Sequence, residues 1–256
     1  MSSGNGDRIP RLASRRESSP PLRVEVHPDA TVVSRRAAAT IAEAARQAIR
    51  QRDRFVLALS GGNTPQQMLR FLAAEIIDWQ KVHVVQVDER VAPTGSSDRN
   101  LTQLRETLFA RAPIPAEQIH AMPVDSFDLA AAAVGYGHLL TSLAGSPPLL
   151  DLVHLGLGTD GHTASLVSGA AAMEVHSADV AVTEAYRGWR RMTLTFPIIN
   201  RARRILWLVT GEEKAEVVAR LARGDHSLLA SRISRTQALL LTDQRDTYSS
   251  QLRRSE

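Results

Sequence analysis

The chain has 256 residues, of which 43% are hydrophobic, 23% charged and 4% aromatic, as expected for a globular protein with an aliphatic core. It contains no cysteine, which excludes disulfides, thiolate metal sites and cysteine nucleophiles. No hydrophobic run approaches the ~20 residues that cross a bilayer, and the N-terminus lacks the apolar stretch of a secretory signal. We therefore expect a cytoplasmic protein with no membrane partner.

The formal charge of +4 lies mainly at the ends of the chain. Residues 1–23 contain five arginines and only two carboxylates, and they are rich in Ser and Pro. Such a composition predicts a disordered tail over residues 1–23 and one folded domain over residues 24–256. Because the rest of the chain is close to neutral, no nucleic-acid partner is expected. The sequence predicts no particular oligomeric state.

The elements after this tail alternate between apolar strands and amphipathic helices. Predicted strands cover residues 24–26, 55–59, 82–87, 151–157, 180–183, 192–196, 205–209 and 238–241. Predicted helices cover residues 34–50, 100–111, 128–143 and 212–222, with another beginning at Pro65. Ser34 and Thr64 are expected to cap the first two helices, and Gln67 to complete a capping box with Thr64. This order predicts an α/β fold: one Rossmann-like, mostly parallel sheet with helices on both faces.

Ligands of such sheets bind beyond the carboxyl ends of the strands, and the first polar cluster there is a glycine loop. It follows the strand 55–59 and contains Gly61, Gly62, Asn63 and Thr64. Backbone N–H groups at a helix N-terminus, together with hydroxyl and amide donors, can hold a phosphate. The loop lacks the spacing of a dinucleotide site or a nucleoside triphosphate loop. It therefore predicts either an anion site or a plain tight turn.

The second cluster, Asp88-Glu89-Arg90, directly follows the strand 82–87. One interpretation is a solvated loop with an internal ion pair. The other is a ligand site, since Arg90 would share a sheet edge with the glycine loop and could donate two hydrogen bonds to a phosphate. Lys214, one of only two lysines in the chain, opens the helix after the strand 205–209 and is expected at the same edge, either as a ligand or as an ordinary exposed helical lysine.

The third cluster is the most specific, because it places His162 beside Gly156, Gly158 and Gly161 at a strand end. Asp160, two residues before the histidine, is the candidate to orient the imidazole. A histidine in this setting suits a general base, since the reference pKa of imidazole is ~6.5. The other seven histidines have no such setting and are interpreted as packing or surface residues.

At these residues the chain resembles the 6-phosphogluconolactonase family. The matching segments are residues 59–65, 88–90, 97–100, 155–166, 191–195 and 208–215. The resemblance implies hydrolysis of 6-phospho-D-glucono-1,5-lactone without a cofactor or metal. It further implies that His162 activates water and that Asn63, Thr64, Arg90 and Lys214 bind the substrate. The chain departs from the family pattern in its Arg-rich tail and at residues 229–232, where the family more often has a proline.

Two other functions remain open from the residues. An amino-sugar or ketose phosphate isomerase or deaminase would share the glycine loop and the Gly-His turn. Glucosamine-6-phosphate deaminases, however, follow that turn with a segment containing a glutamate, whereas residues 164–167 here are Ala-Ser-Leu-Val. A sugar-phosphate sensor would keep the anion loop without a base, but the 23-residue tail is too short for a DNA-binding helix pair.

Overall fold

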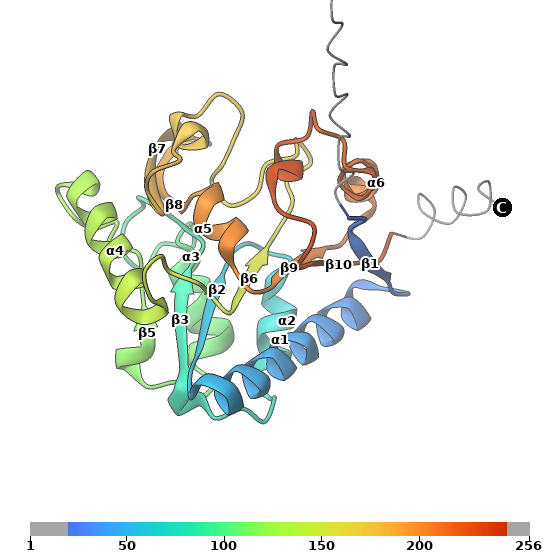
Figure 1. Ribbon diagram of the computed structural model, residues 1–256, viewed down its shortest axis with the longest axis horizontal. Coiled ribbons are helices and arrows are strands. Elements are labelled where there is room, and N and C mark those ends of the chain that lie inside the picture. The colour runs from blue at the N-terminus through green and yellow to red at the C-terminus, as the bar shows by residue number, and fades with distance from the viewer. Residues whose placement is uncertain (1–19, 245–256) are drawn as a thin grey trace, which may run out of the picture.

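The computed structural model describes residues 20–244 as one α/β unit built around a seven-stranded sheet (Figure 1). All of its strands pair in parallel, in the order β1-β10-β9-β6-β2-β3-β5. The strands are β1 (Arg23–Val26), β2 (Phe55–Leu59), β3 (Val82–Gln86), β5 (Ile119–His120), β6 (Leu152–Leu155), β9 (Ile205–Val209) and β10 (Ala238–Thr242). The predicted Rossmann-like, mostly parallel sheet is confirmed. Of the predicted tail, residues 1–19 lie outside the described part, while Leu22 is already buried.

Helices cover both faces of the main sheet because its central strands are apolar on both sides. In β2, Val56 and Ala58 enter one core and Phe55, Leu57 and Leu59 the other. The second core is closed by α1 (Ala30–Arg52), α2 (Pro65–Ala73) and α3 (Asn100–Leu104), which a π-helical turn at Arg105–Phe109 continues. The first core is closed by α4 (Leu129–Ala144), α5 (Phe196–Arg201) and α6 (Ala215–Arg223).

A second, three-stranded antiparallel sheet was not predicted. It consists of β4 (Asp88–Arg90), β8 (Trp189–Leu194) and β7 (Val180–Tyr186), in the order β4-β8-β7. The residues predicted as two more strands of the main sheet therefore form this hairpin, which packs against α4 (Figure 1). The cluster Asp88-Glu89-Arg90 is likewise a strand rather than a solvated loop, and Glu89 is fully buried.

The first helix starts earlier than predicted, whereas the second starts at Pro65 as predicted but without the predicted capping bonds. Helix α1 begins four residues before Ser34, since Asp29 accepts hydrogen bonds from the N–H groups of Thr31 and Val32 as its N-cap. Thr64 does stand at the N-cap of α2 with Pro65 behind it, but its side chain makes no capping bond. Gln67 completes no capping box, because it donates to the Thr31 hydroxyl of α1.

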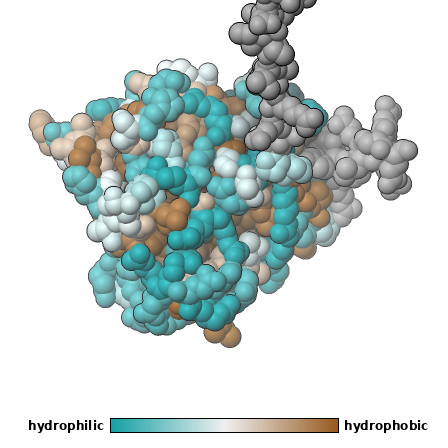
Figure 2. All heavy atoms as spheres, viewed as in Figure 1, coloured by the Kyte–Doolittle hydropathy of each residue, from teal (hydrophilic) through white to brown (hydrophobic). Residues whose placement is uncertain are grey.

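The surface shown in Figure 2 mixes hydrophilic and apolar residues without one broad apolar patch. Among the described residues, the large apolar side chains that are exposed come from separate parts of the chain: Val26, Ile76, Phe127 and Val134. No helix within residues 20–244 is long and apolar enough to cross a membrane.

Candidate active site

A cavity of about 550 Å³ lies where β2, β3, β6 and β9 of the main sheet end. It brings together segments that are far apart in the chain, as expected for the carboxyl edge of a parallel sheet. All but one of the residues predicted for the site line it, namely Gly61, Gly62, Asn63, Thr64, Asp88, Arg90, His162 and Lys214. The exception is Asp160, which contacts His162 from outside the lining.

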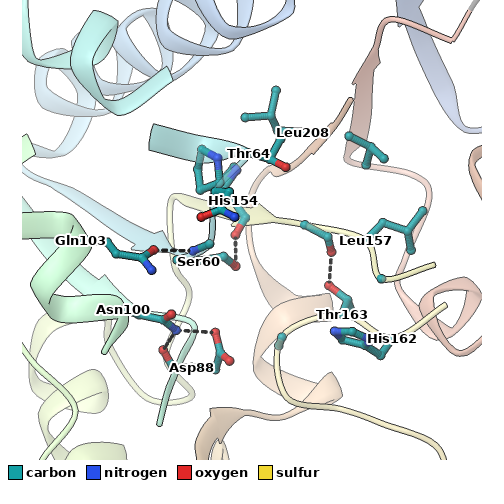
Figure 3. A pocket seen from close by; sticks show the side chains of 18 of the residues that line it. Ser60, Thr64, Asp88, Asn100, Gln103, His154, Leu157, His162, Thr163 and Leu208 are labelled. Atoms are coloured by element: carbon teal, nitrogen blue, oxygen red, sulfur yellow. Dashed lines mark hydrogen bonds between the residues drawn. The ribbon is translucent and has the colours of Figure 1, made fainter. Parts of the chain in front are cut away.

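The glycine loop is held against α3 by side chains that sequence reasoning did not assign. The Gly62 N–H, expected to be free for an anion, instead donates to Gln103 Oε1 over 2.8 Å (Figure 3). A Cβ on Gly61 would lie 2.2 Å from the Asn100 side chain, so only glycine fits there. The loop therefore has a fixed shape, and its remaining backbone and the Asn63 and Thr64 side chains face the cavity.

Asp88 belongs to a buried polar network on the same side of the cavity. Its carboxylate accepts a hydrogen bond from Asn100 Nδ2 at 3.2 Å (Figure 3). It also accepts one from Ser165 Oγ at 2.6 Å, and the Arg191 guanidinium lies 3.9 Å away. Burial lowers the pKa of Arg191, which Asp88 opposes by favouring the charged form. Asp88 is thus committed to neighbouring protein groups rather than free to act as a base.

Glu89, the next residue, organises the start of α3. Its two carboxylate oxygens accept four hydrogen bonds of 2.8 Å, from Gln86 Nε2 and from the backbone N–H groups of Arg90, Asn100 and Leu101. A carboxylate at a helix N-terminus satisfies N–H groups that have no partner within the helix. This buried acid therefore shapes the site without entering it.

The loop that carries His162 lies opposite, on the right of Figure 3. It closes on itself, since Gly158 N–H donates to His162 O and Gly161 N–H donates to Gly158 O, both over 2.9 Å. A Cβ at Gly158 would lie 2.2 Å from His162 Nδ1 and 2.4 Å from Asp160 Oδ1. Glycine at this position is what lets the carboxylate and the imidazole meet.

Asp160 and His162 form a hydrogen-bonded pair, with 2.5 Å between Oδ1 and Nδ1. Partial burial tends to raise the pKa of Asp160, but the hydrogen bonds and charge of His162, with a further bond from Tyr186, lower it to about 2. Asp160 is therefore ionised and can only accept, so the proton of this hydrogen bond is on Nδ1, and Nε2 is the ring nitrogen that is not bonded to Asp160. The His162 side chain is 19% exposed and lines the cavity.

Two further contacts support this loop. Lys214 Nζ donates to the Leu157 carbonyl over 2.8 Å, so the lysine braces the loop as well as lining the cavity. The 3-10 turn Leu229–Arg232, where the chain departs from the family pattern, supplies the Ala230 N–H to Gly161 O at 3.1 Å. The segment that differs from the family pattern therefore contacts the turn that carries His162.

The cavity is cationic, with Arg90, Arg187, Arg191 and Lys214 against the carboxylates of Asp88 and Asp98. Sequence reasoning missed Arg187 and Arg191. Arg191 lies in a segment that matches the family, which was a usable signal. Arg187 lies in no matching segment and reaches the cavity only because the β7–β8 hairpin turns there.

His154 is a buried residue of the cavity wall that was interpreted as packing. It lies on β6, is 1% exposed, and neither ring nitrogen has a hydrogen-bond partner. Burial lowers its pKa to about 4, so the ring is neutral. Among residues 20–244 no three His, Asp or Glu side chains cluster as ligands for a metal ion.

The fold and the site together define an α/β enzyme that handles small anionic substrates. The chain belongs to the glucosamine-6-phosphate isomerase/6-phosphogluconolactonase family, whose sequence model matches residues 28–241. The chain is 38% identical to the 6-phosphogluconolactonase of Nostoc sp. over 202 residues, covering 77% of this chain and 84% of that one. It is 34% identical to the 6-phosphogluconolactonase of Mycobacterium tuberculosis over 234 residues, covering 86% and 95% of the two chains.

Solved structures agree with the fold. The 6-phosphogluconolactonase of Trypanosoma brucei superposes with a TM-score of 0.76 at 28% identity, covering 88% of this chain and 97% of that chain. The 6-phosphogluconolactonase of Thermotoga maritima gives a TM-score of 0.76 at 25% identity, covering 86% and 98%. A monomeric glucosamine-6-phosphate deaminase, 21% identical, shares the fold with a TM-score of 0.71.

Proposed function

We propose that the protein is a 6-phosphogluconolactonase, which hydrolyses 6-phospho-D-glucono-1,5-lactone to 6-phospho-D-gluconate in the oxidative pentose phosphate pathway. Curated relatives with this activity match most of the chain. The observation that carries the mechanism is the Asp160–His162 pair at the wall of a cationic cavity. The site thus combines a base that can activate water with cationic side chains that can bind a phosphate.

His162 acts as the general base. Asp160 holds the Nδ1–H, so Nε2 accepts a proton from a water that attacks the lactone carbonyl carbon. The new C–O bond yields a tetrahedral oxyanion, and its collapse breaks the bond between the carbonyl carbon and the ring oxygen. The imidazolium returns its proton to that ring oxygen, which becomes the free hydroxyl of the open-chain acid. The cyclic ester thus takes up one water, and His162 is regenerated.

Arg90 and Lys214, which both line the cavity, bind the substrate phosphate. Arg90 extends from β4, where Nη1 donates to the Asp98 carbonyl, and Lys214 stands at the start of α6. Gly61, Gly62, Asn63, Thr64 and Asp88 complete the binding wall. Guanidinium and ammonium groups suit a phosphate dianion, and the loop at the N-terminus of α2 adds backbone dipoles of the same sense.

The test is hydrolysis of freshly generated 6-phosphogluconolactone, with the spontaneous opening subtracted. We expect enzymatic acceleration proportional to protein concentration and no turnover of glucosamine-6-phosphate, because no carboxylate follows the histidine turn. Turnover of the amino sugar would instead indicate a deaminase or isomerase. Binding of the lactone without acceleration would indicate a sensor. Either outcome would overturn the proposal.

A further inference from the structure

The turn of the β7–β8 hairpin reaches the catalytic loop through Tyr186, the last residue of β7. The turn residues Arg187 and Gly188 both have positive φ, 50° and 86°, and Tyr186 pairs with Trp189 across them. Two-residue turns of this kind favour Asn, Asp or Gly, so an arginine at the first position is unusual. The pairing also shifts register between Thr183 and Tyr186, which sets the direction of the tyrosine side chain.

Tyr186 extends the Asp160–His162 pair by one hydrogen bond. Its hydroxyl donates to Asp160 Oδ2 over 3.0 Å, while Oδ1 accepts from His162 Nδ1. The Tyr186 ring also meets the imidazole edge to face, with centroids 5.8 Å apart and an interplanar angle of 69°. Both carboxylate oxygens are thereby occupied, and the Tyr186 ring packs against the imidazole.

The tyrosine is itself held by two cations of the cavity. The guanidinium carbons of Arg187 and Arg191 lie 5.2 Å and 5.3 Å from its ring centroid. Arg191 Nη2 also donates to the Tyr186 carbonyl over 3.3 Å. Since Arg191 is buried beside Asp88, Tyr186 connects the histidine loop to the polar network on the other side of the site.

We propose that Tyr186 is a positioning residue for the hydrolysis, fixing the Asp160 carboxylate so that it presents one oxygen to His162. This inference rests on the proposed function. The Asp160 side chain is 47% exposed, so water competes with protein donors for hydrogen bonds to both of its carboxylate oxygens. A fixed donor such as the tyrosine hydroxyl is therefore required to hold its orientation. A carboxylate anchored at one oxygen cannot rotate freely, so the imidazole keeps the tautomer and orientation that a base requires.

The test is Tyr186→Phe, which removes the hydroxyl and keeps the ring. We expect kcat on 6-phosphogluconolactone to fall about tenfold with KM nearly unchanged, as for loss of a hydrogen bond to a charged group. The acid limb of the pH–rate profile should move to higher pH. Without the tyrosine hydroxyl, the Asp160 carboxylate has one hydrogen-bond donor fewer, so its negative charge stabilises the protonated imidazole more strongly. The charged groups packed around this pair include Arg187 and Arg191, which lie against the Tyr186 ring, and Lys214, which binds the Leu157 carbonyl of the same loop.

Tyr136→Phe is the matched control. The Tyr136 hydroxyl makes two hydrogen bonds, one from Gln86 N–H and one to the His120 carbonyl, but it lies in the core away from the cavity. That variant should lose stability to urea while kcat and the pH–rate profile stay as in the wild type. A merely structural role for Tyr186 would produce the same pattern.

A double variant separates positioning from other effects. In an Asp160→Asn background, Tyr186→Phe should cause little further loss of kcat, because the carboxylate that it positions is gone. If the wild type hydrolyses the lactone but Tyr186→Phe keeps its kcat and acid limb, or if the two losses multiply, the positioning role is wrong. If the wild type itself shows no lactonase activity, the proposed function fails first.

Discussion

Two acidic segments lie at the same edge of the sheet and differ in what satisfies them. In β4, Glu89 is fully buried and accepts four hydrogen bonds, three of them from backbone N–H groups. In the loop after β6, Asp160 is 47% exposed and its two oxygens bond mainly to the side chains of His162 and Tyr186. The first acid stabilises backbone, and the second acts on a titratable ring.

The two carboxylates have different roles at the cavity because their hydrogen-bond partners differ. A carboxylate bound by backbone N–H groups keeps the strand and helix in place and gives the wall its shape. A carboxylate bound to an imidazole changes which nitrogen carries the proton. We therefore expect changes in β4 to act on stability or on substrate binding, and changes in the histidine loop to act on the rate of the chemical step.

The largest effect is expected for His162→Ala. Loss of the general base should lower kcat by ~10² to 10⁴ while the fold and KM remain close to wild type. The wild-type rate should fall toward acid because a protonated ring cannot accept a proton from water, and this limb should vanish in the variant. Asp160 cannot supply the limb at mildly acidic pH, since its pKa of about 2 keeps it ionised there.

The measurement is initial rate against pH, with spontaneous opening subtracted at each pH. A variant that retains more than about a tenth of the wild-type kcat, or an unchanged acid limb, would show that the base lies elsewhere. Asp160 would then not be the acid that acts on the catalytic base.

The next largest effect is expected for Glu89→Gln, which tests whether the buried acid stabilises the fold. The amide offers one acceptor oxygen and places an NH₂ group toward buried N–H donors, so we expect a loss of about 3 kcal/mol in the free energy of unfolding. Urea unfolding followed by circular dichroism measures it. Glu184→Gln, on the exposed part of β7, is the control and should stay within about 0.5 kcal/mol. Equal small losses would contradict the role assigned to Glu89.

His154, unlike either acid, is a buried titratable group whose ring nitrogens have no hydrogen-bond partner. Because its pKa is lowered to about 4, the folded state resists a proton that the unfolded chain binds near pH 6.5. Stability is unaffected above that value and falls as the pH drops below it, by about 2 kcal/mol between pH 7.5 and 5. His154→Leu should remove that part of the acid sensitivity, as urea midpoints at the two pH values would show. An unchanged pH dependence in the variant would refute this.

The smallest effects concern Arg90 and Lys214, which both line the cavity. Alanine at either should raise KM for the phosphorylated lactone by about tenfold, because a charged hydrogen bond to the phosphate is lost. The KM for glucono-1,5-lactone, which has no phosphate, should be nearly unaffected. Lys214→Ala should also lower kcat on both lactones, since Lys214 supports the Leu157 carbonyl before the histidine turn. An equal rise in KM on both substrates would contradict a phosphate role.

The sequence predicted those parts of the fold that depend on local pattern. The apolar run Phe55–Leu59 has the bounds of β2, and Ile205–Val209 has those of β9, because a buried parallel strand is apolar at every position. The residues after these strands had to meet at one edge, so the shared position of the glycine loop, Arg90, His162 and Lys214 followed from topology.

What the sequence did not predict depends on contacts between distant segments. Residues 88–90 carry three charges and look like a loop, yet they pair with residues 191–193 about a hundred positions away. That pairing gives Glu89 its burial and brings Arg191 to Asp88. Tyr186 likewise meets Asp160 only because a hairpin turn is directed into the cavity, and no local pattern in residues 180–189 indicates this.

Because the chain contains so few lysines, the site can be labelled selectively with an amine-reactive reagent. The chain has two lysines, Lys81 and Lys214. Lys81 forms an ion pair of 2.6 Å with Asp53. It lies near the start of β3, at the edge of the sheet opposite the cavity. An amine-reactive reagent therefore has one lysine target in the cavity, and its attachment there can be read by peptide mass. The rate of that labelling, with and without the product 6-phosphogluconate, would report occupancy of the cavity even in variants too slow to assay.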